Sequence, residues 1–375
     1  MKLPRAHHLP AEELAGQVLM PAVYISSLNR NSRAAKNLLK MVRQYHVGGI
    51  ILFGDHPADV QHWVNQLQQT ARYPLLVAAD LERGAGGIFS GGTIFPHALA
   101  WGAAGDLALV EDAARVIANE AKVMGINTIF SPVLDLANQP ENPIINIRGF
   151  HSDPEKVSEI GACFVRVMEK EGIACVAKHF PGHGRTHSDS HLNLPQIGNS
   201  FAELLDSDLL PFRKAAEHSI RGVMTGHLKL ADDPRPATFR DDLLTGYLRK
   251  ELDFQGLIYS DSLEMGAIVN NYSAMEQITD GIRAGLDIFL MPRNLPLFHS
   301  LIQKSAENDP AVRQILEKSV DRIFRQKKWL HRQTPQKPHP GRLYKFLEHP
   351  GHISVSRHIA EKSVTCLHHS ERFPL

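Results

Sequence analysis

Short apolar runs alternate with longer amphipathic segments through most of the chain. The apolar runs span residues 21–27, 47–54, 74–80, 127–136, 173–180, 221–230, 256–262 and 287–292. Between and after them, apolar residues recur at helical spacing over 33–45, 56–71, 106–124, 154–171, 202–218, 240–252, 271–285 and 309–327. Nearly continuous apolar strands separated by helices are typical of parallel strands buried on both faces. The pattern therefore predicts an α/β fold with eight strand–helix units.

Eight such units favour a closed (β/α)8, TIM-like barrel. A doubly wound open sheet stays open as an alternative, because periodicity alone does not show closure. Several polar residues end the predicted strands, namely Asp80, Asp135, Lys178 with His179, His227 and Asp261. In a barrel these positions converge on one mouth, where active sites are built. Their shared placement favours the barrel.

The pattern changes after about residue 330. Residues 331–342 are rich in proline and polar side chains, which is typical of a linker. A short tail follows, with an amphipathic helical start and an apolar run, and it is too short to form a domain. We expect one catalytic domain over residues 1–330, then a linker and tail over 331–375.

Composition excludes some partners. The net charge is +1 and 22% of residues are charged, so nothing indicates a nucleic-acid or acidic-membrane partner. No apolar stretch approaches the length of a membrane span. The N-terminus has Glu12 and Glu13 before any apolar run, unlike a signal peptide. The odd, sparse set of Cys163, Cys175 and Cys366 fits a reducing compartment, so we expect a cytoplasmic protein.

Residues 177–195, AKHFPGHGRTHSDSHLNLP, form the most informative stretch. They hold histidines at intervals of four residues, at His179, His183, His187 and His191. On a continuous helix this spacing would align a row of metal ligands. However, Pro181, Gly182 and Gly184 interrupt any helix, and neither an HExxH pattern nor a Cys partner is present. We therefore expect no metal and no other cofactor.

In the same stretch, one residue separates Asp189 from His191 on a long loop after the fifth predicted strand. If the backbone turns, the carboxylate can orient the imidazole and stabilise its protonated form. Such an imidazole can protonate a leaving oxygen and then deprotonate water. The alternative is that Asp189 caps a turn and His191 is a surface histidine.

Asp261 ends the apolar strand 256–262 and precedes a predicted helix. At the mouth of a barrel this carboxylate could attack an anomeric carbon, although an aspartate before a helix is also a common N-cap. Asp80 could accept hydrogen bonds from sugar hydroxyls. The glycines that follow Asp80 do not form the GxGxxG dinucleotide fingerprint. Arg148 offers a rigid fork of donors, or else a structural ion pair.

Five segments together resemble glycoside hydrolase family 3, most closely its β-N-acetylglucosaminidase branch. They are DLERGAGG (80–87), FSPVLDL (130–136), NPIINIRGF (142–150), KHFPGHGRTHSDSH (178–191) and SDSLEMGAI (260–268), in family order. The resemblance covers roughly residues 10–330. The combination of KHFPGHG with DSH separates this branch from members that use a distant carboxylic acid as acid/base.

The resemblance implies a carbohydrate substrate with a terminal β-linked N-acetylglucosamine, released with retention through a covalent glycosyl-enzyme. Members of this branch commonly act in peptidoglycan recycling. Asp261 matches the nucleophile, and Asp189 with His191 matches the acid/base dyad. The residues that match sugar-binding positions are Asp80, Arg148, Lys178 and His179, together with His227 at a strand-six position near the site.

Two features depart from the family pattern. The arginine that the family places eight residues after Asp80 is replaced by Ile88, and Arg83 is a candidate substitute. Residues 360–375 resemble the entry to a second, α/β sandwich domain, which predicts a truncated or single-domain form. Apolar residues of this tail, such as Val364, Leu367 and Phe373, then need another partner, for example the barrel surface.

Alternative functions stay open at this point. One is a relative acting on β-glucosides or β-xylosides, and another is a sugar-binding protein with little catalysis. A metal-dependent hydrolase is a third. Phosphorolysis instead of hydrolysis is also open, because phosphate meets less repulsion beside a histidine than beside a carboxylate.

Overall fold

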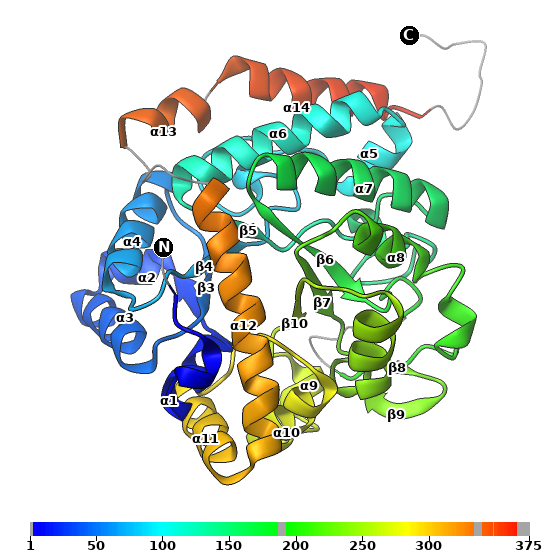
Figure 1. Ribbon diagram of the computed structural model, residues 1–375. Helices are drawn as coiled ribbons and strands as arrows, with labels where there is room; N and C mark the ends of the chain where they lie inside the picture. The colour runs from blue at the N-terminus through cyan, green and yellow to red at the C-terminus, as the bar shows by residue number, and fades with distance from the viewer. Residues whose placement is uncertain (1–2, 187–192, 334–339, 348, 366–375) are drawn as a thin grey trace, which may run out of the picture.

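The computed structural model describes residues 3–186, 193–333, 340–347 and 349–365. Its centre is a parallel, curled, seven-stranded sheet in the order β10-β7-β6-β5-β4-β3-β2 (Figure 1). The strands are β2 (Ala22–Tyr24), β3 (Gly49–Phe53), β4 (Leu76–Ala79), β5 (Thr128–Ile129), β6 (Ala174–Phe180), β7 (Gly222–Thr225) and β10 (Leu257–Ser260). Every residue of β4, β6, β7 and β10 is buried, as the apolar runs predict.

A further pair of strands lies between the two edges of this sheet. β1 (Leu19–Met20) pairs in parallel with β11 (Phe289–Leu290), and only Pro21 separates β1 from β2. On its other side, β11 is preceded by Ile288, which forms a parallel bridge with Tyr259 of β10. Each of the eight predicted apolar runs therefore contributes a strand to this parallel arrangement.

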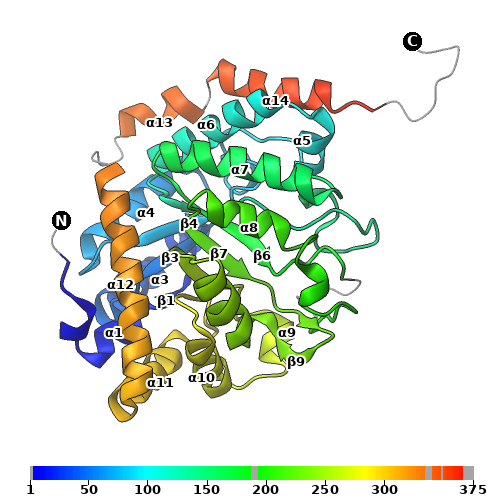
Figure 2. The ribbon, with the colours of Figure 1, turned by 45° about the vertical axis from the view of Figure 1, so that its right-hand side comes forward.

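Helices cover the outside of the strands (Figures 1 and 2). The first half of the chain provides α1 (Ala11–Gln17), α2 (Ile25–Arg30), α3 (Ser32–Tyr45), α4 (Pro57–Thr70), α5 (Ala98–Ala104), α6 (Leu107–Met124) and α7 (Pro154–Lys170). The second half provides α8 (Leu210–Glu217), α9 (Gly266–Val269), α10 (Ala274–Ala284), α11 (Leu295–Asn308), α12 (Pro310–Gln333), α13 (Pro340–Leu347) and α14 (Pro350–Lys362). Short 3-10 helices are η1 (Ala6–His8), η2 (Ala85–Gly87), η3 (Asn146–Arg148), η4 (Ala202–Leu204) and η5 (Ala237–Phe239), and η6 (Asp242–Glu251) is a π-helix.

Local sequence explains where several helices begin and end. The side chain of Asp106 accepts hydrogen bonds from two amides of the first turn of α6, and Gly125 ends that helix in a left-handed conformation, with φ 84°. Ser273 and Glu276 form a capping box at the start of α10. These caps fix the lengths of the connections between helices and strands.

The structure differs from the sequence-based expectation around residues 221–230. The expected single strand is divided into β7 and β8 (Lys229–Leu230), and β8 pairs antiparallel with β9 (Asp233–Pro236). The dividing residues, Gly226 to Leu228, include His227, whose ring is fully buried. The hydrophobic pattern did not indicate this turn, because the residues of the apolar run are buried whether they form a strand or a turn.

Helices include both ends of the expected linker 331–342, whose residues 334–339 lie outside the described part of the chain. α12 continues to Gln333, beyond the expected domain end at residue 330, and α13 begins at Pro340. α14 packs along α5 and α6, at the outermost layer of Figure 1. Val364 remains 80% exposed, so it does not gain the partner that was expected for it; Leu367 and Phe373 lie outside the described residues.

Polar contacts connect α14 to the loop that follows β4. Ser356 Oγ donates to Ile94 O at 2.8 Å, and His352 Nδ1 lies 3.1 Å from Glu120 Oε1. The buried Glu120 carboxylate of α6 also accepts from Thr93, at 2.9 Å from the amide and 2.7 Å from the hydroxyl. The same loop is closed on itself by hydrogen bonds from Gly86 N to Thr93 O and from Phe95 N to Arg83 O. The C-terminal helix thus contacts the loop that begins with Asp80.

None of the helices in the described part of the chain is long and apolar enough to span a membrane.

Candidate active site

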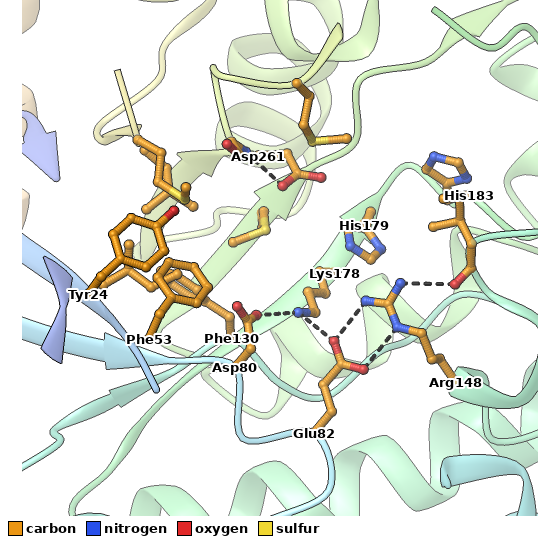
Figure 3. Close-up of a pocket in the computed structure, with 17 residues that line it drawn as sticks. Tyr24, Phe53, Asp80, Glu82, Phe130, Arg148, Lys178, His179, His183 and Asp261 are labelled. Atoms are coloured by element: carbon orange, nitrogen blue, oxygen red, sulfur yellow. Dashed lines mark hydrogen bonds and ion pairs between the residues drawn. The ribbon is translucent and has the colours of Figure 1, made fainter. Parts of the chain in front are cut away.

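A cavity of about 460 Å³ opens where the carboxyl ends of the parallel strands meet (Figure 3). Such a volume is ordinary for ligand clefts, which measure about 300–1,000 Å³. Its polar lining consists of Asp80, Glu82, Arg148, Lys178, His179, His183, Asp261 and Ser262. Its apolar lining consists of Tyr24, Ile51, Phe53, Phe130, Ile144, Met224, Met265, Leu290 and Met291. The strand-end residues Asp80, Lys178, His179 and Asp261 are therefore brought together, as the barrel hypothesis expected.

A chain of ion pairs forms the floor of the polar side. Lys178 Nζ lies 2.7 Å from Asp80 Oδ1 and 2.7 Å from Glu82 Oε1. Arg148 donates to both oxygens of Glu82, from Nε at 3.0 Å and from Nη2 at 2.7 Å. Figure 3 shows these four side chains side by side at the base of the cavity. Two carboxylates and two cations alternate, so each charge has a partner of the opposite sign.

The pKa values of these groups follow from that alternation. Burial raises the pKa of the Glu82 carboxyl, but Lys178 and Arg148 overcome that effect and lower it far below its ordinary value. Burial lowers the pKa of Lys178, but Asp80 and Glu82 raise it above its ordinary value. Glu82 and Lys178 therefore stay charged at neutral pH, which lets the floor present fixed donors and acceptors to sugar hydroxyls.

Asp261 follows β10 and points into the cavity. Burial raises the pKa of its carboxyl, but the nearby His179 and His227 rings lower it, and the net shift is downward. The amide of Ser262 also donates to Asp261 Oδ1 at 2.7 Å. These groups favour an ionised carboxylate, which is the form required of a nucleophile.

The structure answers the capping alternative for Asp261. The next helix, α9, begins at Gly266 with Met265 as its N-cap, and no side chain caps it. Asp261 accepts a hydrogen bond from the amide of the adjacent Ser262, which lies before α9. Asp261 is therefore not a helix cap, and its carboxylate faces the cavity.

His227 lies behind Asp261 and is not among the residues that line the cavity. Its Nε2 is 3.1 Å from Ser262 O and its Nδ1 is 2.8 Å from Thr238 Oγ1. Burial lowers the pKa of His227, so the neutral ring donates from Nε2 to the carbonyl. This placement supports the turn after Asp261 and differs from the direct sugar contact expected of His227.

Asp135 holds the end of β6 in place. Its fully buried carboxylate accepts from the amides of His179 at 3.0 Å and His183 at 2.6 Å, and from His179 Nδ1 at 2.7 Å. Burial raises the pKa of the Asp135 carboxyl, but His179 and His183 lower it overall. The bond to Nδ1 fixes the His179 ring, which lines the cavity with its remaining edge.

The first residues of the loop after β6, 181–186, form its stem and are held by close contacts. Gly182 has φ 125°, a conformation that favours glycine, and Gly184 lies so close to Leu136 O that a Cβ atom would clash. Arg185 Nε pairs with the buried Asp208 at 2.8 Å. These contacts explain the glycines of the FPGHG segment.

Beyond this stem, the catalytic dyad predicted at Asp189 and His191 lies outside the described residues, as does His187. The chain returns beside β8, where Ile197 N donates to Lys229 O at 3.0 Å. The role of the dyad therefore stays a prediction.

Sequence reasoning missed several residues of the site. Glu82 belongs to the segment DLERGAGG but was assigned no role, because it follows the strand by three residues and its two cationic partners are distant in sequence. Tyr24 and Phe53 end two strands that were expected, yet no chemistry was assigned to them. Their place after apolar runs was the available signal.

Ile88 stands where the family has an arginine, and Arg83 was the candidate substitute for it; neither side chain lines the cavity. Ile88 packs against the core, and Arg83 Nε donates to Phe95 O at 3.0 Å. Arg83 lines a separate, much smaller cavity behind Glu82 and Arg148. Arg83 therefore does not take the place of the family arginine in the cavity. Arg148, in contrast, lines the cavity.

Within the described residues, no group of three or more His, Cys, Asp or Glu side chains is arranged to hold a metal ion. His179 and His183 line the cavity, with ring centroids 5.9 Å apart. The Nδ1 atom of His179 is engaged by Asp135 Oδ2, and the Nδ1 atom of His183 is engaged by Thr186 Oγ1.

Residues 11–326 match the family model described as the Glycosyl hydrolase family 3 N terminal domain. The chain belongs to glycosyl hydrolase family 3. The match covers all the cavity residues described above.

Individual family 3 relatives agree with this assignment. The chain is 34% identical over 341 residues to the Beta-N-acetylglucosaminidase/beta-glucosidase of Cellulomonas fimi, covering 87% of this chain and 60% of that protein. It is 31% identical over 332 residues to the Beta-hexosaminidase of Nitrosospira multiformis, covering 86% of this chain and 91% of that protein. The solved family 3 β-N-acetylglucosaminidase of a Paenibacillus species superimposes with a TM-score of 0.85 at 30% identity, over 98% of this chain and 71% of that one. The chain thus spans less than two thirds of the Cellulomonas protein.

Proposed function

We propose that this family 3 chain hydrolyses terminal β-linked N-acetylhexosamine residues with retention of configuration. The observation that carries the proposal is the Asp261 carboxylate, which lines the cavity together with a floor of alternating charges suited to sugar hydroxyls. The named relatives support it, since their names include β-hexosaminidase and β-N-acetylglucosaminidase. In this proposal β11 completes a (β/α)8 barrel as its eighth strand, and the cavity is the mouth of that barrel.

The floor binds the non-reducing sugar. Asp80 accepts hydrogen bonds from sugar hydroxyls, while Lys178 and Arg148 donate to sugar oxygens. His179, oriented by Asp135, provides a further contact at the edge of the ring. Glu82 holds the two cations at a fixed separation and is a positioning residue. His227 acts behind the site by holding the Ser262 carbonyl and thus the turn after Asp261.

The reaction proceeds in two steps. The Asp261 carboxylate attacks the anomeric carbon, the bond to the glycosidic oxygen breaks, and that oxygen takes a proton from His191. A water molecule then attacks the same carbon, gives a proton to His191, and releases Asp261 with the sugar hydroxylated in its original configuration. Asp189 orients His191 throughout. This use of Asp189 and His191 rests on the family resemblance alone.

A mutational assay tests the nucleophile. Asp261→Asn is expected to lower turnover of 4-nitrophenyl β-N-acetylglucosaminide by at least about 10⁴-fold, because the amide cannot form the glycosyl-enzyme. Asp206→Asn, at a position whose side chain is 97% exposed, is the matched control and should keep wild-type activity. A 5-fluoro-N-acetylglucosaminyl fluoride should label wild type by one sugar mass and leave Asp261→Asn unlabelled. Full activity in Asp261→Asn would refute the assignment.

One observation favours a second candidate substrate. The name of the Cellulomonas relative includes β-glucosidase, and the floor binds hydroxyls common to both sugars. Assays with aryl β-glucoside and β-xyloside beside the N-acetylglucosaminide, each with and without phosphate, separate these activities and also separate phosphorolysis from hydrolysis. A peptidoglycan source for the substrate and a cytoplasmic location stay predictions.

A further inference from the structure

A second, much smaller cavity lies behind the floor of the sugar site. It measures about 10 Å³ and shares the side chains of Glu82 and Arg148 with the large cavity. Its other polar side chains are Arg83, His97 and Ser131. About 10–15 Å³ is enough to hold a single water molecule. This cavity therefore suits a ligand of one atom and is too small for a phosphate, a sulfate or any part of a sugar.

Arg83 brings a positive charge to the small cavity that no described carboxylate offsets. In the floor of the sugar site, each of the two cations pairs with a carboxylate. Arg83, in contrast, forms no ion pair within the described part of the chain. Its Nε donates to Phe95 O at 3.0 Å, and its remaining guanidinium N–H groups have no acceptor among the described residues. Because a guanidinium stays charged in proteins, this charge favours a negative ligand.

Ser131 and His97 add hydrogen-bond donors to the same cavity. Ser131 is 4% exposed, and its hydroxyl forms no hydrogen bond with another described side chain or backbone group. Burial and the charge of Arg83 lower the pKa of the His97 ring, so at neutral pH the ring is uncharged and has one N–H donor. Both oxygens of Glu82 already accept hydrogen bonds from Arg148. Donors thus outnumber available acceptors around the cavity, which favours an anion over a cation.

The backbone that carries Arg83 and His97 is held in place. Phe95 N donates to Arg83 O at 2.9 Å, so the two residues are joined by this bond as well as by the one from Arg83 Nε. Trp101 Nε1 donates to Pro96 O at 3.1 Å, directly before His97. The loop after β4 therefore places these donors around the cavity before a ligand binds, which lowers the entropic cost of binding.

We propose that the small cavity binds a single halide ion, such as chloride, with Arg83 as its charged partner. The ion offsets the Arg83 charge and accepts hydrogen bonds from Ser131 and His97. A water molecule, which also fits the volume, would leave that charge without a counter-ion. Since Glu82 and Arg148 line both cavities, the ion also steadies the floor of the sugar site from behind. Only this effect on the floor rests on the proposed function.

Diffraction tests the site on the unaltered chain. Bromide resembles chloride in charge and hydrogen bonding, and its anomalous scattering locates it in crystals soaked in sodium bromide. We expect an anomalous peak within hydrogen-bond distance of Arg83 and Ser131. Density in the small cavity without an anomalous signal would identify a water molecule and overturn the proposal.

Thermal unfolding tests the same site in solution. An ion that binds only the folded protein raises the unfolding temperature. Sodium chloride is expected to raise it by about 1–2 °C over sodium acetate at equal ionic strength, because acetate is too large for the cavity. Arg83→Gln should abolish this difference and Ser131→Ala should reduce it. Arg115→Gln, which removes an arginine that is 47% exposed and paired with Glu111, is the matched control and should keep it. An undiminished chloride effect in Arg83→Gln would place the ion elsewhere and overturn the proposal.

Activity separates the halide site from the proposed function. If the ion steadies the floor, chloride should raise kcat/KM on the aryl N-acetylglucosaminide by about 2- to 5-fold over acetate in wild type, but not in Arg83→Gln. Bound bromide without such a change would refute the effect on the floor. If wild type cleaves none of the aryl glycosides in either salt although bromide is bound, the proposed function fails and the halide site is retained.

Discussion

Lys178 and Lys327 are buried to almost the same degree, at 3% and 2% exposure, but at opposite ends of the strands. Lys178 lies near the carboxyl end of β6, 2.7 Å from each of two carboxylates. Lys327 lies on α12 beside the amino end of β1, and its Nζ donates to the neutral amide oxygen of Gln17 at 2.7 Å. The pKa of Lys178 is raised by Asp80 and Glu82 despite burial. Burial lowers the pKa of Lys327 to about 7.

The comparison shows that buried positive charge has different surroundings at the two ends of the strands. At the cavity, two carboxylates keep the buried Lys178 ammonium charged. Burying these charges costs free energy, but charged groups at this place can recognise a ligand. At the other end, the Lys327 ammonium is hydrogen-bonded to the neutral Gln17 amide and lies 5.8 Å from the centroid of the Phe324 ring, so in the described part of the chain its charge is paired with no anion and lowers stability. Substitutions at these two lysines should therefore change different properties of the protein.

Of the substitutions that test this comparison, Lys178→Met is expected to have the largest effect. This change leaves Asp80 and Glu82 facing each other without the cation between them and removes a donor to the sugar. We expect kcat/KM on the aryl N-acetylglucosaminide to fall by at least about 10²-fold. Lys327→Met is the matched control and should leave kcat/KM unchanged. Equal losses of kcat/KM in the two variants would contradict the expectation that only the lysine at the cavity contributes to activity.

Glu82→Gln should have the next largest effect. The amide keeps the shape of the side chain but no longer attracts both Lys178 and Arg148, so the two donors lose their fixed separation. We expect kcat/KM to fall by about 10- to 100-fold, because small displacements of binding groups reduce catalysis strongly. Glu171→Gln, which breaks the ion pair with Lys122 on the outer surface, controls for the loss of any ion pair and should change little. Unchanged activity in Glu82→Gln would show that Glu82 does not position the floor.

Lys327→Met should change stability with activity preserved. At neutral pH, replacing a buried ammonium that has no anionic partner among the residues the structure describes by an apolar side chain of similar length is expected to raise the free energy of unfolding by about 1 kcal/mol. Thermal or urea unfolding at pH 7 measures the change. A large loss of stability would mean that the hydrogen bond to Gln17 outweighs the cost of burying the charge.

A further prediction concerns the pH dependence of that stability. Lys327 has a pKa of about 7 when folded and an ordinary value of 10.5 when unfolded, so between these values the unfolded state binds more protons. Stability due to Lys327 therefore rises with pH over this window and is lowest below pH 7. The gap between Lys327→Met and wild type should shrink from pH 7 to pH 9, as measured by urea unfolding at several pH values. A constant gap would contradict the lowered pKa.

The sequence predicted the parts of this molecule that depend on local pattern. Each of the eight apolar runs contains an observed strand, and strand ends such as Lys178 and Asp261 do meet in one cavity. The extension of α12 to Gln333 and the division of 221–230 were not predictable, because they depend on packing that the local pattern does not encode.

The pairing between distant residues was also out of reach. Arg148 was left open as either a ligand-binding or a structural residue, and the structure shows a guanidinium that pairs with Glu82 while lining the cavity. The Tyr24–Phe53 stack depends on the register between β2 and β3, which a one-residue slip would abolish. Residues brought together by register or by charge pairing carry no signal in either segment alone.

The attachment of α14 has a practical consequence for handling the protein. Because His352 and Ser356 contact Glu120 and the Ile94 carbonyl, a tag or cleavage near the end of the chain also acts on the loop that carries Asp80 and Glu82. Removing this helix would leave the Glu120 and Thr93 side chains open to water at the back of that loop. Sugar affinities measured on a protein without α14 would then reflect the loss of its contacts to this loop as well as the intrinsic affinity of the sugar site.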